Sequence, residues 1–130
     1  MRIDHVGYAV KNIDKAKPQF EVLGFSFGET VEDIDRGIYI CFGDNDGYCI
    51  ELVAPIKGAE NPIDQVLVKS GATPYHFCYK SENLEEDIEE LVKAKFMVTK
   101  EPAKAIAFGG NRVAFLYNAK VGLVELVEEA

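Results

Sequence analysis

The sequence predicts an α+β fold made of two pseudo-symmetric βαβββ modules, and three observations support this prediction. The 130 residues match the length of one domain, and 48% of them are hydrophobic, which is enough to bury a core. The two halves of the chain resemble each other, and each half has the periodicity of a strand, a helix and three further strands. We therefore expect a single domain over residues 1–130, with module one at about 1–55, a linker at about 56–73 and module two at about 74–130.

The internal repeat is the strongest of these observations. At offsets of 71 (76 − 5) and 74 (125 − 51), matching residues recur in the same order: His5 and His76, Asn12 and Asn83, Phe25 and Phe96, Glu51 and Glu125. A predicted strand at 38–42 aligns with one at 112–116 at the larger offset. We expect the three extra residues (74 − 71) in the loops of the second half, around 103–111.

In the first half, residues 3–10 are rich in β-forming side chains and predict the first strand. A helix is expected after Asn12, with Pro18 ending or kinking its first turn and Gly24 closing it. The segment 44–47 predicts a tight turn between strands at 38–42 and 48–53.

The linker and second half follow the same scheme. Asn61 and Pro62 are expected to start a short helix that ends near Gly71. A strand at 75–79 precedes a helix that Asn83 can cap, with acidic residues in its first turn and lysines near its end. Two more strands, at 112–117 and 123–127, are expected around a turn at 118–122.

Composition excludes several partners. A formal net charge of −8 argues against nucleic acid and anionic membranes, because both require clustered Lys and Arg. No signal peptide and no apolar run of about 20 residues is apparent, and the cysteines, 3 in number, fit no metal or redox spacing. We expect a cytoplasmic protein with reduced thiols.

Two histidines and two glutamates occupy equivalent places in the repeat: His5, Glu51, His76 and Glu125. Each Glu is flanked by apolar strand residues, and a buried carboxylate needs a compensating partner such as a cation. A single strand His is more often packed or exposed than a ligand, and a single strand Glu usually faces solvent. The repeat nevertheless favours one N2O2 site for a divalent ion such as Zn²⁺, Ni²⁺, Co²⁺, Mn²⁺ or Fe²⁺.

Motifs along nearly the whole chain resemble one family, the glyoxalase, bleomycin-resistance and extradiol-dioxygenase superfamily, also called vicinal oxygen chelate. The motifs are Asp4-His5-Val6-Gly7-Tyr8-Ala9-Val10, Leu23-Gly24-Phe25, Ile50-Glu51-Leu52-Val53, His76, Val113-Ala114-Phe115-Leu116 and Val124-Glu125-Leu126. The resemblance implies a glyoxalase-like fold, in which paired βαβββ modules form a metal-binding cleft.

A complete His, Glu, His, Glu set is similar to those of glyoxalase I (lactoylglutathione lyase) and methylmalonyl-CoA epimerase. The resemblance implies removal of a proton next to a carbonyl, with the metal as Lewis acid and Glu125 or Glu51 as base. We expect a glyoxalase I-like isomerase that forms an enediolate from a thiol adduct. The thiol need not be glutathione, because Ala9 and Pro55 stand where glutathione-using members carry Arg and Asn.

Two other functions stay open. The first is methylmalonyl-CoA epimerase, with an acyl-CoA substrate, and the second is a non-catalytic binding or resistance module of the superfamily. Candidate substrate-binding groups are the guanidinium groups of Arg36 and Arg112 and the backbone N–H groups of Gly109 and Gly110. A homodimer is also expected.

Overall fold

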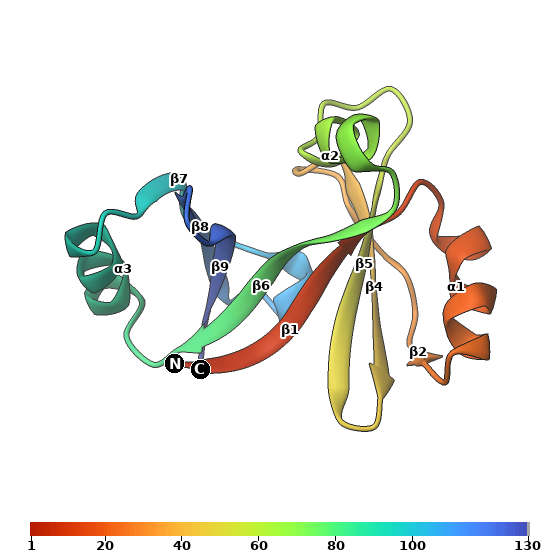
Figure 1. Cartoon of the computed structure of the whole chain (residues 1–130), viewed down its shortest axis with the longest axis horizontal. Coiled ribbons are helices and arrows are strands. Elements are labelled where there is room, and N and C mark those ends of the chain that lie inside the picture. Colours follow the sequence, from red (N-terminus) through yellow and green to blue (C-terminus); the bar gives the residue numbers. More distant parts are fainter. Residues whose placement is uncertain (130) are drawn as a thin grey trace. The chain divides into compact units, whose positions relative to one another are not determined.

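The computed structural model describes residues 1–129, which divide into two compact units (Figure 1). The first unit comprises His5–Tyr75, and the second comprises Met1–Asp4 together with the chain from His76 onward. None of the helices within residues 1–129 is long and apolar enough to cross a membrane. The mixed strand and helix content confirms the predicted α+β class.

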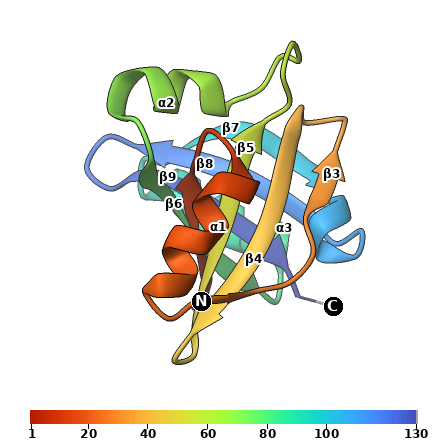
Figure 2. The same ribbon diagram turned by 90° about the vertical axis from the view of Figure 1, so that its right-hand side faces the viewer.

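The first unit is a small sheet covered by a helix. Its elements, the first of which begins in the other unit, are β1 (Arg2–Ala9), α1 (Ile13–Val22), β2 (Ser26–Phe27), β3 (Val31–Asp33), β4 (Ile38–Asn45), β5 (Tyr48–Pro55) and α2 (Ile63–Ser70). Strand β5 lies parallel to β1 and antiparallel to β4, and β4 also pairs with β2 and β3. Helix α1 packs on one face of this sheet (Figure 2), where Ile13 joins Cys41 and Leu52 in a buried cluster.

The second unit repeats this plan. Its elements are β6 (Thr73–Ser81), which begins in the first unit, then α3 (Leu84–Lys93), β7 (Met97–Lys104), a 3₁₀ turn (Ile106–Phe108), β8 (Arg112–Asn118) and β9 (Gly122–Glu128). Strand β9 is parallel to β6 and antiparallel to β8, and β8 pairs with β7. Leu84 of α3 packs against Ala114, Leu116 and Leu126, so one face of this sheet is also covered by a helix.

The second unit has the expected βαβββ order, whereas the first unit departs from it at one strand. The strand expected after the first helix is split into β2 and β3, which pair with different parts of β4. The corresponding strand β7 is continuous but has two register shifts between Val98 and Ala103. Pro102 lies within that stretch and has no N–H to donate to the ladder.

The alignment of the strand at 38–42 with 112–116 is wrong by one residue. Phe42 lies opposite Glu51, and Phe115 lies opposite Glu125, so the true offset on this strand is 73 (115 − 42) rather than 74. A shift of one residue exchanges the two faces of a strand. The structure thus assigns Phe42 and Phe115 to equivalent positions.

The physical reason for this error is turn length. The turn between β4 and β5 contains only Asp46 and Gly47, whose positive φ angles of 51° and 83° are those of a type I′ turn. The turn between β8 and β9 contains three residues, 119–121, because Asn118 pairs with Gly122. One of the three extra residues therefore lies in this turn, outside the expected region at 103–111, and only two precede β8.

The helix boundaries follow the predicted capping residues. Asn83 accepts a hydrogen bond from the backbone N–H group of Glu86, which confirms the predicted N-cap, and Asn12 caps α1 in the same way by accepting from Lys15. Helix α1 continues through Pro18 to Val22, so proline does not end the helix at its first turn. In the linker, the Asn61 side chain accepts hydrogen bonds from the first N–H groups of α2, which ends at Gly71 as expected.

Both module helices end in the same hydrogen-bonded motif. The N–H groups of Gly24 and Phe25 bond back to Glu21 and Phe20 after α1, and those of Lys95 and Phe96 bond back to Val92 and Leu91 after α3. This is the Schellman pattern, in which the residue after the cap adopts positive φ. Gly24 has a φ of +108°, whereas the equivalent residue of the second unit is Lys95 with a φ of +76°.

We expect Lys95→Gly to stabilise the protein by about 0.5–1 kcal/mol, because glycine adopts this conformation without steric cost. The matched control is Gly24→Ala, which is expected to destabilise the protein, since the new Cβ would lie 3.2 Å from the Asn45 side chain as well as at positive φ. Urea unfolding of the three proteins measures both effects. A Lys95→Gly protein less stable than wild type would contradict the strain argument.

Candidate metal centre

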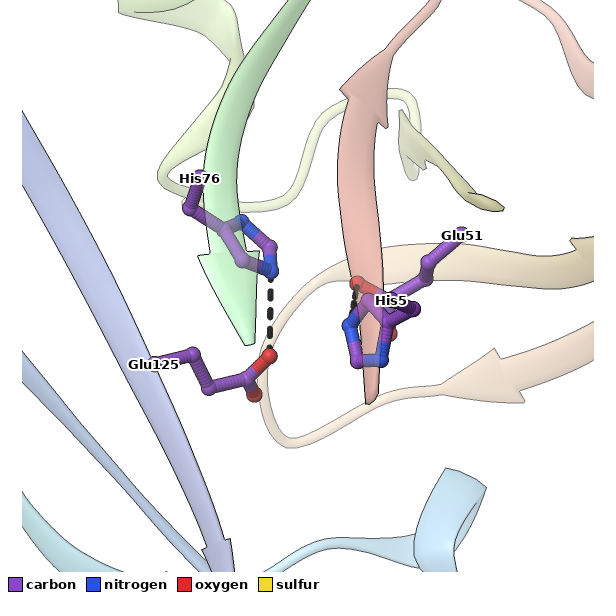
Figure 3. A group of neighbouring side chains, drawn as sticks. All are labelled: His5, Glu51, His76 and Glu125. Carbon is purple, nitrogen blue, oxygen red and sulfur yellow. Dashed lines mark hydrogen bonds and ion pairs between the residues drawn. The ribbon is translucent and has the colours of Figure 1, made fainter. Parts of the chain in front are cut away.

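The first unit contains a buried histidine and glutamate side by side. His5 comes from β1 and Glu51 from β5, where Glu51 pairs with Gly7, two residues beyond His5. Their side chains therefore lie on the same face of the sheet. The His5 Nε2 atom is 3.4 Å from Glu51 Oε1, and the two residues are only 1% and 4% exposed (Figure 3).

The second unit contains the equivalent pair. His76 comes from β6 and Glu125 from β9, where Glu125 pairs with Cys78, again two residues beyond the histidine. The His76 Nε2 atom is 3.0 Å from Glu125 Oε1, and the residues are 4% and 3% exposed (Figure 3). The same strand register thus produces the same pair in both units, as the sequence repeat predicts.

Both carboxylates lie in apolar surroundings that make an uncompensated charge costly. Glu51 shares its face of β5 with the buried Val53, and Glu125 shares its face of β9 with the buried Val127. Desolvating an ionised carboxylate costs several kcal/mol unless a cation or hydrogen bonds offset it. Each pair offers one imidazole nitrogen and one carboxylate oxygen, which suit divalent transition metals. The donor chemistry of both pairs therefore fits a divalent metal ion.

An aromatic ring accompanies each pair, and no sequence motif distinguished it as part of the site. Phe42 makes an edge contact with His5, with ring centroids 5.5 Å apart and planes at 78°. Phe115 makes the same contact with His76, at 5.5 Å and 87°. The two phenylalanines are related by an offset of 73 residues. The sequence repeat alone could not identify them as equivalent, because that offset depends on the lengths of the turns.

The candidate anion-binding arginines are engaged with acidic side chains. Arg112 forms an ion pair with Glu85 at 2.7 Å. It also donates hydrogen bonds from Nε and Nη2 to the carboxylate of Glu128. Arg36 contacts the buried carboxylate of Asp33 at 3.2 Å. These contacts neutralise much of the charge that an anionic substrate would need, so they weaken the support for both candidates.

The backbone of the candidate glycine pair is engaged as well. The N–H groups of Gly109 and Gly110 donate to the carbonyl groups of Ile106 and Ala105, which closes the 3₁₀ turn. Both glycines have positive φ, and nothing lies within 4 Å of a Cβ placed on either. Their N–H groups therefore hold the turn together in this structure.

The ion pairs of Arg112 predict a pH-dependent stability. Hydrogen bonds from Arg112 lower the pKa values of Glu85 and Glu128, and in turn Glu128 and Glu85 raise the pKa of Arg112. Carboxylates with lowered folded-state pKa values contribute stability above their unfolded pKa of about 4.3 and lose it as the pH falls through the folded values. Thermal unfolding of Arg112→Gln should therefore show a lower Tm than wild type at pH 7.

The Tm difference between wild type and Arg112→Gln should shrink as the pH falls below about 4.3. The control is Arg2→Gln, which removes an arginine that pairs with Glu129 at 2.9 Å and is 71% exposed at its side chain, so a smaller effect is expected. A Tm difference that stays constant from pH 7 to pH 3 would show that the ion pairs do not carry the effect.

Paired βαβββ units, each with a buried His–Glu pair, define the vicinal-oxygen-chelate class of fold and site. A family model described as the glyoxalase/bleomycin resistance protein/dioxygenase superfamily matches residues 4–115. The chain belongs to this superfamily.

Several relatives resemble the chain over almost its full length. It is 33% identical to the mitochondrial methylmalonyl-CoA epimerase of Bos taurus over 129 residues, which are 96% of this chain and 73% of that protein. The mitochondrial methylmalonyl-CoA epimerase of Homo sapiens is 31% identical over 96% of this chain and 72% of its own length. The crystal structure of methylmalonyl-CoA epimerase from Mycobacterium tuberculosis matches with a TM-score of 0.84 and 26% identity, over 99% of this chain and 88% of that one.

Proposed function

We propose that this protein is a metal-dependent isomerase of the methylmalonyl-CoA epimerase type, acting on a 2-methyl-branched acyl-CoA. The observation that carries the proposal is the buried His–Glu pair that the same strand register places in each unit. The two mammalian relatives with 33% and 31% identity are both methylmalonyl-CoA epimerases, which supports this choice of substrate.

His5, Glu51, His76 and Glu125 are proposed to hold one divalent ion between them. A single ion would satisfy both buried carboxylates at once, and a His2Glu2 set is chemically suitable for Ni²⁺, Zn²⁺, Co²⁺ or Mn²⁺. When bound, such an ion acts as a Lewis acid toward the substrate carbonyl and so lowers the barrier to losing the neighbouring proton.

The residues of the chain are proposed to move the proton. Epimerisation requires a base that removes the proton from C2 and an acid that returns a proton to the opposite face of that carbon. A carboxylate oxygen of Glu51 or Glu125 can accept the proton, and the buried surroundings of both residues exclude water that would compete for it. The burial of the pairs would also strengthen electrostatic interactions at the reacting carbon.

A glyoxalase I-type reaction is the second candidate, because the same four-residue set would serve it. The relatives favour the epimerase over the glyoxalase I-type reaction that the sequence motifs led us to expect. Ala9 adds to this preference, since it is fully buried and carries no group that could bind glutathione. A homodimer and a cytoplasmic location remain predictions from the sequence.

The test compares kcat/KM for methylmalonyl-CoA with kcat/KM for hemithioacetals of glutathione and other thiols, with one metal throughout. We expect turnover of the acyl-CoA and poor use of the glutathione adduct. Each missing charge-assisted hydrogen bond costs about 1.5–3 kcal/mol, or roughly 10–150-fold in affinity. A glutathione value near about 10⁸ M⁻¹s⁻¹ with no turnover of the acyl-CoA would overturn the proposal in favour of glyoxalase I.

A further inference from the structure

Two phenylalanines on neighbouring strands stand in the same relation to the two histidines. Phe42 on β4 lies directly across from Glu51, and Phe115 on β8 lies directly across from Glu125. Residues that pair directly across antiparallel strands place their side chains on the same face, about 5 Å apart. Each ring therefore shares a sheet face with its unit's His–Glu pair.

The ring contacts have matching geometry in the two units. Phe42 and His5 have centroids 5.5 Å apart with planes at 78°, and Phe115 and His76 have centroids 5.5 Å apart with planes at 87°. The two contacts arise from different spacings along the chain, 37 residues (42 − 5) and 39 residues (115 − 76). The same edge contact is thus reached although the chain between histidine and phenylalanine is two residues longer in the second unit.

An edge-packed ring restricts an imidazole in a way that a hydrogen-bonding partner does not. The second torsion of a histidine side chain is broad, so packing must select the orientation of the ring. Aromatic pairs favour perpendicular contacts at this distance, and such a contact resists rotation of the imidazole. A phenylalanine has no polar atom, so it does not compete with a carboxylate or a metal for the ring nitrogens.

We infer that Phe42 and Phe115 are positioning residues, which orient the imidazoles of His5 and His76 for metal binding. The inference rests on the proposed metal site and adds two residues that act through its ligands. Their effect is on the geometry and affinity of the metal site, and they take no part in proton transfer. Loss of either ring leaves all four ligand side chains in place but allows an imidazole to turn.

The test replaces each ring with a flexible apolar side chain of similar volume, in Phe42→Met and Phe115→Met. Phe42→Tyr and Phe115→Tyr retain the ring and serve as conservative rescues. The matched control is Phe25→Met, which removes a ring that packs on the helix-covered face of the first unit, against Phe20 and Phe27. The readouts are the metal Kd, from competition with a chromophoric chelator, the visible spectrum of the Co²⁺-loaded protein, and Tm.

We expect each Phe→Met variant to bind metal roughly 10–100-fold more weakly and to change the Co²⁺ spectrum, as loss of an outer-shell partner does. The tyrosine variants should retain most of the affinity, and Phe25→Met should lower Tm without changing either metal readout. The inference would be overturned, with the proposed metal site left standing, by one combination of results. Both Phe→Met proteins would show the wild-type Kd and Co²⁺ spectrum, while His5→Ala and His76→Ala would lose the metal. Failure of wild type to bind metal would instead overturn the proposed metal site.

If a methionine variant does not fold, the corresponding leucine variant replaces it. The spectrum of the Co²⁺-loaded tyrosine variant then serves as the second measurement, because a ring that still packs against the imidazole should leave that spectrum close to wild type. The inference would be contradicted if both folded tyrosine variants had Co²⁺ spectra that differ from wild type and the leucine variants had the same spectra as the tyrosine variants.

Discussion

Alanine in place of His5 or His76 is expected to remove the same single metal ion from the protein. Each residue belongs to a different unit, so the result tests whether the two His–Glu pairs act as one site. We expect wild type to hold about one ion per chain. Each variant should bind metal at least about 100-fold more weakly, because even the loss of an outer-shell partner costs roughly 10–100-fold. Isomerase activity should fall by about 10³-fold or more, since Lewis-acid stabilisation is worth several kcal/mol.

The measurement is metal content per chain after dialysis, with activity assayed in parallel. Ser81→Ala is a useful control, because it removes a buried hydroxyl that donates to Asp87 at 2.5 Å and so perturbs the core of the second unit without removing a proposed ligand. That variant should lose stability and keep its metal. Two ions in wild type and one in each histidine variant would show that the pairs bind metals separately.

Glutamine in place of Glu51 or Glu125 is expected to separate proton transfer from metal binding. The amide keeps an oxygen that can coordinate a metal but cannot accept the proton from C2. We expect kcat to fall by about 10²–10⁴-fold in the variant that loses the base, which is the usual contribution of general-base catalysis. At saturating metal, with occupancy confirmed for each variant, the loss of kcat identifies the carboxylate that acts as base.

The matched control for the glutamine variants is Glu85→Gln. It replaces an exposed carboxylate of the second unit that pairs with Arg112 and lies in α3, outside the proposed ligand set. Its kcat should stay close to that of wild type, because α3 packs on the face of the sheet opposite Glu125. If neither Glu51→Gln nor Glu125→Gln reduces kcat at full metal occupancy, another group must take the proton.

Much of the fold was predictable because local chemistry determines it. Asn12 and Asn83 cap their helices, Asn61 caps the linker helix, and Asp46 with Gly47 forms the tight turn, all through short-range hydrogen bonds or φ preferences. Pro18 does not end α1 at its first turn, because the helix continues to Val22. The predicted register of β8 was wrong because the turn between β8 and β9 has three residues, whereas the turn between β4 and β5 has two. Sequence similarity does not resolve that difference.

The pairing within each half of the candidate site was also predictable, because the repeat relates His5 to His76 and Glu51 to Glu125. The partners of Arg112 were not predictable. Glu85 and Glu128 come from other elements of the fold, and the positions of charged residues along the chain do not reveal such contacts. Phe42 and Phe115 were missed for a related reason. An aromatic residue in a strand usually belongs to the hydrophobic core. Only the cross-strand partners of Phe42 and Phe115 show that these two residues lie beside the His–Glu pairs.

Deuterium incorporation into methylmalonyl-CoA tests the central claim most directly, namely metal-dependent removal of the proton at C2. The substrate is incubated in D2O with protein stripped by a chelator and with protein to which metal has been restored, and mass spectrometry follows the gain of one deuterium. The account predicts rapid exchange by the metal-loaded protein, none above the protein-free rate by the stripped protein, and recovery when metal returns. Exchange that survives complete removal of metal, or no exchange by the fully loaded protein, would contradict it.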